Sequence, residues 1–280
     1  MSLPPAAPAH GALVAPDTPF WTPDWPAPAG VQALCTTRAG GVSAAPWDSL
    51  NLGTHVQDDP AHVAINRARL QAEVHRRGGG PLLFLNQVHG DRVVRLAAGA
   101  ALPQGEAADG ALSAQAGATL VMMVADCLPV LFTDTQGRRV AAAHAGWRGL
   151  AGGVLDATVA ALIAPGADGP GLPASSVLAW LGPCIGPSAF EVGPEVREAF
   201  MRHHPAAASA FVPQAHGRWL ADLPALARQR LAALGVSAVY GNDGTTPWCT
   251  YTQSALFFSH RRDSRRFGHT GRLAACIWRT

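Results

Sequence analysis

The sequence of 280 residues contains no lysine, so all 21 residues counted as lysine or arginine are arginines. A chain without lysine cannot form a Schiff base through an amine, cannot use a P-loop lysine and has no lysine general base. Arginine stays protonated, and its planar fork binds carboxylate and phosphate groups with two parallel hydrogen bonds. The permanent side-chain cations that this protein can offer to an anion are therefore all guanidinium groups.

Charge is also scarce, because charged residues make up 14% of the chain and the formal net charge is +2. The sequence lacks the basic stripe that is typical of proteins that bind nucleic acid. Its most apolar run, 118–132, is interrupted by Asp126 and Pro129 and is too short to span a bilayer. We therefore expect a globular protein that binds small molecules and neither nucleic acid nor a membrane.

The five cysteines are too widely spaced to form a disulfide framework, and no C-x-x-C motif occurs. They are Cys35, Cys127, Cys184, Cys249 and Cys276. The first ten residues contain neither a basic residue nor an apolar core, so they do not resemble a signal peptide. Free thiols are typical of a reducing compartment, and we expect a cytoplasmic protein.

Strand and helix patterns alternate irregularly along the chain, which predicts one mixed α/β domain over residues 30–280. Residues 1–29 are rich in proline and alanine, and we expect them to form an irregular lead-in. The apolar patterning predicts strands at 31–38, 81–90, 91–96, the start of 175–187 and the end of 251–279. It predicts helices at 58–79 (with Asp59 as N-cap), 149–163, 194–204 and 221–235.

The segment TQGR (135–138) predicts a turn between two apolar runs. If residue 134 pairs with residue 139 across this turn, His144 lies opposite Pro129. Because strand side chains alternate between faces, Cys127 and His144 would then share one face at the same end of the hairpin. A slip of one residue in the turn would separate them.

A third candidate ligand is His89, which lies at the end of the predicted strand 81–90. One cysteine and two histidines would leave a fourth coordination position open, which is the pattern of catalytic zinc sites. By spacing alone, a small buried cysteine with ordinary hydrogen-bonded histidines remains the alternative. Asp126, expected to point away from Cys127 or to lie at the rim, is a candidate proton shuttle.

The segment HAGWRG (144–149) joins a predicted strand to a predicted helix. Backbone N–H groups at a helix N-terminus attract anions, and Arg148 adds a fixed positive charge. Gly146 and Gly149 would let a ligand approach the backbone closely. An ordinary tight connection between strand and helix is the alternative interpretation.

Nine short motifs occur in order along the chain, and together they resemble the bacterial laccase-domain family, also called YfiH-like. They are TTRAGGVS (36–43), NLGTHVQDDP (51–60), NQVHG (86–90), ADGALS (108–113), ADCLPV (125–130), HAGWRG (144–149), LGPCIGP (181–187), FEVG (190–193) and SHRRDSRRFGHTGR (259–272). The resemblance covers about residues 20–279.

The resemblance implies a four-layer α/β/β/α fold with mixed sheets and a metal site formed by His89, Cys127 and His144. It implies zinc-dependent phosphorolysis of adenosine, inosine, guanosine and methylthioadenosine, together with deamination of adenosine. The expected partners are a small nucleoside and phosphate, and we expect a monomer. Candidate contacts to substrate or phosphate are Arg38, Asn51, Gln87, Arg148 and Arg261.

Other activities stay open. The family also carries a copper-dependent polyphenol oxidase label, although this sequence lacks the His-x-His pairs that several copper ions would need. An amidase that edits peptidoglycan precursors is a further possibility within the family. Outside it, Cys127 could act as a nucleophile with His144 as its base and no zinc, or the trio could form a non-catalytic metal-binding module.

Three positions depart from the family pattern. Gln57 stands where the family has glycine, His260 stands where it has tyrosine, and residues 264–269 look like an insertion. None of these positions belongs to the metal trio, but the last two are expected to affect substrate contacts.

Overall fold

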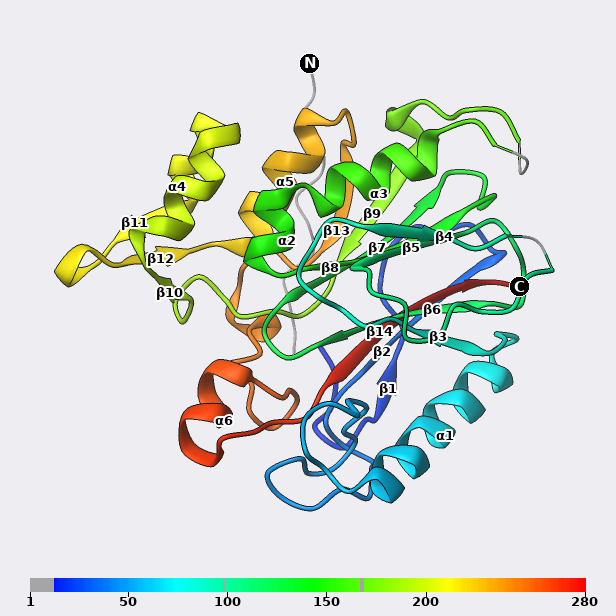
Figure 1. The fold of residues 1–280 in the computed structure, drawn as a ribbon, viewed down its shortest axis with the longest axis horizontal. Helices are drawn as coiled ribbons and strands as arrows, with labels where there is room; N and C mark the ends of the chain where they lie inside the picture. Colours follow the sequence, from blue (N-terminus) through cyan, green and yellow to red (C-terminus); the bar gives the residue numbers. More distant parts are fainter. Residues whose placement is uncertain (1–12, 98, 167–168) are drawn as a thin grey trace.

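The fold is described from a computed structural model, which describes residues 13–97, 99–166 and 169–280. Two β-sheets stack face to face, and helices cover both outer faces, which gives the expected four-layer α/β/β/α arrangement (Figure 1). Within these ranges, no helix has the length and hydropathy that crossing a membrane requires.

The first sheet has five strands in the order β1-β2-β14-β6-β3. Its strands are β1 (Phe20–Trp21), β2 (Val31–Thr36), β14 (Leu273–Arg279), β6 (Thr119–Val124) and β3 (Leu82–Phe84). β3 runs parallel to β6 and the other pairs are antiparallel, so the sheet is mixed. The helix α1 (Pro60–Arg76) covers its outer face, where Leu70 and Val74 pack in a cluster with Trp278.

The second sheet has six strands in the order β13-β9-β7-β8-β5-β4. Its strands are β13 (Ala238–Gly241), β9 (Val177–Leu181), β7 (Leu128–Asp134), β8 (Val140–Ala145), β5 (Gly110–Ser113) and β4 (Val93–Arg95). The helices that pack on its outer face are α2 (Trp147–Gly152), α3 (Val154–Ile163), α4 (Pro194–His203) and α5 (Leu223–Ala233).

Smaller elements lie beside these layers. A three-stranded sheet contains β10 (Glu191–Val192), β12 (Trp219–Ala221) and β11 (Phe211–Pro213). The helix α6 (His260–Phe267) precedes β14. Short 3-10 helices are η1 (Ala174–Ser176), η2 (Pro205–Ala210), η3 (Ala215–Gly217) and η4 (Thr246–Trp248).

The strands β6, β7 and β8 are buried along their whole length, because each sheet is covered on both faces. Alternate residues of one strand therefore belong to different layers of the core. In β6, Leu120 and Met122 belong to the cluster between the sheets, whereas Val121 and Met123 belong to the cluster under α1.

β6 and β7 follow each other in the chain but belong to different sheets. The chain crosses between the sheets at Asp126, whose φ of 93° lies in the left-handed region. Cys127 comes next, immediately before β7. This crossover brings Cys127 to the seam between the two sheets.

β7 and β8 form an antiparallel hairpin in which Pro129 lies opposite His144, so the predicted register is confirmed. The fully buried carboxylate of Asp134 holds the turn. It accepts hydrogen bonds from the backbone N–H groups of Gln136, Arg138 and Arg139. The turn therefore supplies the register that aligns the far end of the hairpin.

Two predicted elements need correction. The helix predicted at 149–163 is two helices, because Gly153 takes a φ of 103° that ends α2 before α3 begins. The strand predicted at 81–90 is shorter, since β3 ends at Phe84. The predicted N-cap Asp59 is confirmed, because its side chain accepts a hydrogen bond from the backbone of the first turn of α1.

The predicted lead-in 1–29 falls partly outside the described residues, which begin at residue 13. Its later part contains β1, and Trp21 is buried between the sheets beside Trp180 and Trp248. Gln57, which stands where the resemblance leads us to expect glycine, takes a φ of 65°, a conformation that glycine adopts at lower cost.

Replacing Asp134 with alanine is expected to lower the free energy of unfolding by about 2 kcal/mol, because three backbone N–H groups lose their acceptor. Asp134→Asn keeps one acceptor oxygen and should lose less. Urea unfolding monitored by tryptophan fluorescence measures both variants. An Asp134→Ala protein within about 0.5 kcal/mol of the wild type would contradict this role.

Candidate metal centre

Cys127 and His144 lie together at the end of the β7–β8 hairpin, at the seam between the sheets. Side chains on the neighbouring positions, Leu128 and Ala145, face the helices on the outer side of the six-stranded sheet. By alternation, Cys127 and His144 face the five-stranded sheet instead. One further step of the same register places Gly146 opposite Cys127.

His89 approaches from the loop after β3, which belongs to the other sheet. Its Nε2 lies 3.8 Å from Cys127 Sγ, and its ring meets the His144 ring edge to face with centroids 4.8 Å apart. The candidate ligand atoms of the three residues all lie within 4.8 Å of one another. Sulfur and nitrogen ligands of a tetrahedral zinc ion are about 3.5 Å apart, so a small inward movement would close the trio around an ion.

A buried carboxylate that the sequence did not single out, Asp109, holds this arrangement. Its Oδ1 lies 2.8 Å from His144 Nδ1 and accepts the backbone N–H of His89 at 2.9 Å. Its Oδ2 accepts the N–H groups of Val88 and Gly90. A histidine whose Nδ1 is bound to a carboxylate presents Nε2 as a ligand. Asp109 therefore fixes both histidines of the trio at once.

The thiol and the imidazole of the trio stabilise each other's charged forms. Burial alone would raise the pKa of Cys127, but the neighbouring His144 and His89 lower it to about 6. Burial alone would lower the pKa of His144, but Cys127 and Asp109 raise it to about 9. The thiolate is the form of cysteine that binds metals. A metal cation would replace the proton that lies between Cys127 and His144.

Two glycines leave room for the trio. A Cβ atom on Gly146 would lie 2.9 Å from Cys127 Sγ and 2.9 Å from His89 Cδ2. A Cβ atom on Gly149 would lie 2.8 Å from the carbonyl oxygen of Gly90. One thiolate and two imidazoles, packed this closely, suit zinc and also copper. The residues present therefore fit a transition metal.

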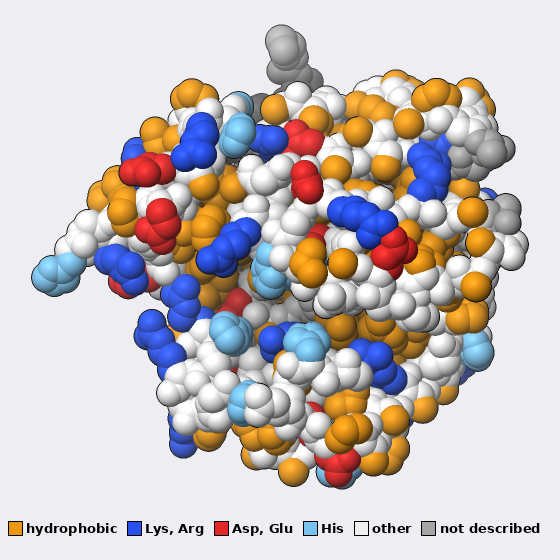
Figure 2. All heavy atoms as spheres, viewed as in Figure 1, with side chains coloured by type: hydrophobic (Ala, Val, Ile, Leu, Met, Phe, Trp, Pro, Cys, Tyr) orange, Lys and Arg blue, Asp and Glu red, His pale blue; other side chains and the backbone are white. Residues whose placement is uncertain are grey.

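The trio lies in the wall of a pocket with a volume of about 360 Å³, which is in the range of small-molecule sites. On the face drawn in Figure 2, the molecule is hollowed above α6, and histidine and arginine side chains gather at the edge of the hollow. The pocket is lined by His55, Leu85, Asn86, Gln87, His89, Met123, Val124, Ala125, Asp126, Cys127, His144, Trp147, Ile185, Phe190, Leu223, His260, Arg261 and Arg272.

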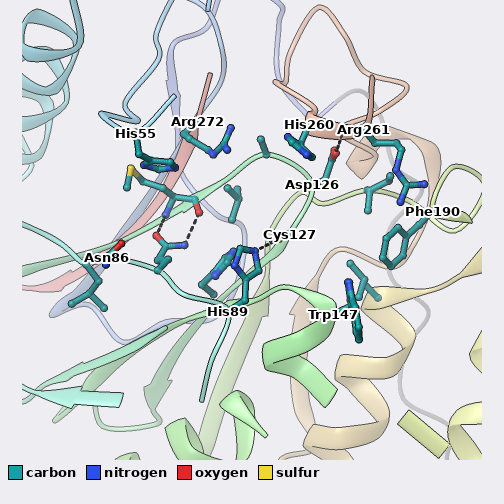
Figure 3. A pocket seen from close by; sticks show the side chains of 18 residues that line it. His55, Asn86, His89, Asp126, Cys127, Trp147, Phe190, His260, Arg261 and Arg272 are labelled. Atoms are coloured by element: carbon teal, nitrogen blue, oxygen red, sulfur yellow. Dashed lines mark hydrogen bonds between the residues drawn. The ribbon is translucent and has the colours of Figure 1, made fainter. Parts of the chain in front are cut away.

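The two sides of the pocket differ in chemistry (Figure 3). Trp147 and Phe190 lie on one side of the trio, with Arg261 above Phe190. His55 and Arg272 lie on the other side. Aromatic faces on one side and cations around the rim suit a ligand that combines a flat ring with an anionic partner.

Three of the predicted substrate or proton contacts line the pocket, namely Gln87, Asp126 and Arg261. The Gln87 amide donates to the carbonyl of Met123 and accepts its N–H, so it ties the His89 loop to β6. The Asp126 carboxylate accepts the hydroxyl of Thr250 and the backbone N–H of Arg261. Both side chains thus already have partners within the protein.

The other three predicted contacts do not line the pocket, so the structure does not bring them to the site. Arg38 is bound to Asp48 and to the carbonyl of Ser254. Asn51 is fully buried, and its amide holds neighbouring backbone and side-chain groups. Arg148 is exposed and stacks on the ring of Trp147. Each of these three side chains is therefore bonded to, or stacked on, neighbouring protein groups outside the pocket.

Several residues of the pocket were missed as site residues by sequence reasoning. They are Asp109 behind the trio and His55, Trp147, Phe190 and Arg272 in the wall, whereas His260, which was expected to affect substrate contacts, does line the pocket. All of them fall within the quoted motifs, which is the signal that could have found them. The suspected insertion 264–269 forms the second half of α6 and its C-terminal turn, and none of its residues lines the pocket.

Gly146→Ala is expected to weaken the binding of Zn²⁺ at least about tenfold, because its Cβ would displace Cys127 and His89. Isothermal titration of metal-free protein measures the affinity. Gly152→Ala in α2 is the matched control, since a Cβ there meets nothing within 4 Å. Equal Zn²⁺ affinity in Gly146→Ala and the wild type would show that this space is not needed.

The chain is similar to proteins named as purine nucleoside phosphorylases. It is 53% identical over 258 residues to one from Pseudomonas aeruginosa, covering 92% of this chain and 97% of that protein. It is 49% identical over 259 residues to the purine nucleoside phosphorylase YfiH of Escherichia coli, covering 91% of this chain and 97% of that protein.

The fold matches solved structures over most of its length. A crystal structure of a Neisseria meningitidis protein aligns with a TM-score of 0.83 and 48% identity, covering 93% of this chain and 99% of that one. YlmD from Geobacillus stearothermophilus aligns with a TM-score of 0.78 and 33% identity, covering 90% and 92%. Residues 32–280 match the family described as multi-copper polyphenol oxidoreductase laccase. The chain therefore belongs to this laccase-like family, which includes the YfiH proteins.

Proposed function

We propose that the protein is a zinc-dependent purine nucleoside phosphorylase for adenosine, inosine, guanosine and methylthioadenosine, and that it also deaminates adenosine. The observation that carries the proposal is the trio of His89, Cys127 and His144 in the wall of a pocket of about 360 Å³ with aromatic and cationic sides. The names of the relatives from P. aeruginosa and E. coli support it.

The side chains that would hold zinc are those of His89, Cys127 and His144. When bound, the ion supplies Lewis-acid chemistry. The protein's own contribution is to keep Cys127 as a thiolate and to hold the His144 ring through Asp109. The ligands are thereby oriented before a substrate arrives, which lowers the reorganisation that binding requires.

In phosphorolysis the C1′–N9 bond of the nucleoside breaks, a phosphate oxygen bonds to C1′, and the departing purine takes up a proton. Trp147 and Phe190 offer faces on which the purine ring can stack. Arg261 offers a permanent positive charge at the rim. In deamination, water adds at C6 and the amino group leaves as ammonia after taking up a proton, and Asp126 is the proposed proton shuttle.

A second candidate rests on the Cys127–His144–Asp109 alignment, which resembles the arrangement of a cysteine hydrolase. The lowered pKa of Cys127 favours a nucleophilic thiolate, and Asp109 orients His144 as a base would require. This hydrolase would stay active after chelation of metal and would lose activity on alkylation of Cys127. The zinc-dependent enzyme would lose activity on chelation and regain it with Zn²⁺.

The family description points to copper and to polyphenol oxidation. A multi-copper centre needs ligands for several ions. Among the described residues, three or more candidate ligand side chains come together at one place, the trio of His89, Cys127 and His144, which suits a single ion. An amidase acting on peptidoglycan precursors is the remaining alternative, and those precursors belong in the same activity screen.

We further propose that the protein acts as a monomer in the cytoplasm. All five cysteines are free thiols, which supports a reducing compartment. Size-exclusion chromatography with light scattering measures the oligomeric state.

Zinc-loaded protein is expected to convert inosine to hypoxanthine and ribose 1-phosphate only when phosphate is present. Cys127→Ala should lose its bound zinc and lower the rate at least about 100-fold, because a ligand is missing. Chromatography of the purines and metal analysis of the protein measure both effects. Cys276→Ala, whose thiol lies under α1, is the matched control and should keep zinc and activity.

Purine release without phosphate, or full activity in Cys127→Ala, would contradict the zinc-dependent phosphorylase. Release of product from a muramoyl-amide precursor in place of a nucleoside would support the amidase instead.

A further inference from the structure

Arg272 lines the pocket with one guanidinium nitrogen bonded to the protein and no acidic partner among the described residues. Its Nη1 donates to the carbonyls of Thr270 and Gly271, and its other guanidinium nitrogens donate to no group of the described residues. Arg262 in the same segment, by contrast, is paired with Asp263. Arg272 lines the pocket on the side opposite Trp147 and Phe190 (Figure 3).

The position of Arg272 is built by two residues of the NLGTHV motif. The Asn51 Oδ1 accepts the backbone N–H of Arg272 at 2.9 Å and the N–H of Gly53. A Cβ on Gly53 would lie 2.7 Å from Arg272 Cγ, so a larger residue at position 53 would displace the arginine side chain. Asn51, which was predicted as a substrate contact, is thus a positioning residue for Arg272.

The charge of Arg272 has no ion-pair partner among the described residues. Burial lowers the pKa of its guanidinium, because a partly desolvated cation is unfavourable without a counter-charge. Asp126 is the carboxylate in the same wall, but its oxygens accept hydrogen bonds from Thr250 and the Arg261 backbone, and it forms no ion pair with Arg272. The Cys127 thiolate also raises the pKa of Arg272 without a hydrogen bond to it, and His55, His260 and Arg261 add no negative charge to the pocket.

We infer that Arg272, with His55 beside it, binds the phosphate that attacks the nucleoside. The inference rests on the proposed phosphorylase function. The free nitrogens of the guanidinium fork can bind two oxygens of one phosphate, and the His55 imidazole can donate to a third. The purine would occupy the aromatic side, so that the phosphate could approach C1′ from the face opposite the leaving base, as displacement at C1′ requires.

The test compares Arg272→Gln with the zinc-loaded wild type in steady-state phosphorolysis of inosine. The KM for phosphate should rise at least about tenfold, since a charge-assisted hydrogen-bond pair is lost, while the KM for inosine stays within about twofold. Adenosine deamination uses water and no phosphate, so its rate should also stay within about twofold. Arg265→Gln, on the exposed part of α6, is the matched control and should leave both constants unchanged.

Arg272→Lys keeps the positive charge but loses the planar guanidinium. Its KM for phosphate should therefore lie between those of Arg272→Gln and the wild type. Zinc analysis and thermal unfolding of each variant separate an effect on phosphate from loss of the metal or the fold. An unchanged phosphate KM in Arg272→Gln, or an equal loss of deamination, would overturn the assignment.

Calorimetric titration of the zinc-loaded protein with inorganic phosphate reads the subsite without catalysis. The wild type should bind phosphate, and Arg272→Gln should bind it at least about tenfold more weakly. This result would support the subsite even if no purine were released, and in that case only the phosphorylase proposal would fail. Phosphate binding that is equal in both proteins, or absent from both, would overturn the subsite itself.

Discussion

The carboxylate of Asp109 is the contact on which the arrangement of the site depends. It is fully buried and accepts hydrogen bonds from His144 Nδ1 and from three consecutive backbone N–H groups, those of Val88, His89 and Gly90. The backbone donors lie in the loop that links β3 of one sheet to β4 of the other, whereas His144 lies in β8. A buried carboxylate is costly unless its hydrogen bonds are made, so this residue holds the His89 loop and His144 in one fixed relation.

The rest of the site follows from where the chain crosses between the sheets. β6 leaves the five-stranded sheet, the backbone turns at Asp126, and Cys127 enters the six-stranded sheet next to His144. The pocket opens at this seam, so segments far apart in the chain can contribute to its wall. Trp147 follows from the hairpin, Phe190 comes from the β9–β10 connection, and Arg272 precedes β14.

The sequence was enough to predict those features that depend on residues close together in the chain. The register of the β7–β8 hairpin follows from a four-residue turn, and that register was enough to bring Cys127 and His144 together. It could not find Asp109 as the partner of His144, because these residues are 35 positions apart and no periodicity links them. The pairing of Asn51 with Arg272, across 221 positions, was out of reach for the same reason. The place of Arg38 was out of reach because an arginine fork suits a phosphate and a backbone carbonyl equally well, and only the fold shows that Arg38 meets the carbonyls of Asp48 and Ser254.

The central claim is that one thiolate and two imidazoles, held by Asp109, bind a single zinc ion in the pocket. X-ray absorption spectroscopy at the zinc edge of protein loaded with one equivalent of Zn²⁺ tests it most directly. The account predicts one sulfur ligand at about 2.3 Å and nitrogen ligands at about 2.0 to 2.1 Å. The sulfur contribution should disappear in Cys127→Ala and persist in Cys276→Ala. A zinc spectrum without sulfur in the wild type, or one that keeps its sulfur in Cys127→Ala, would contradict the account.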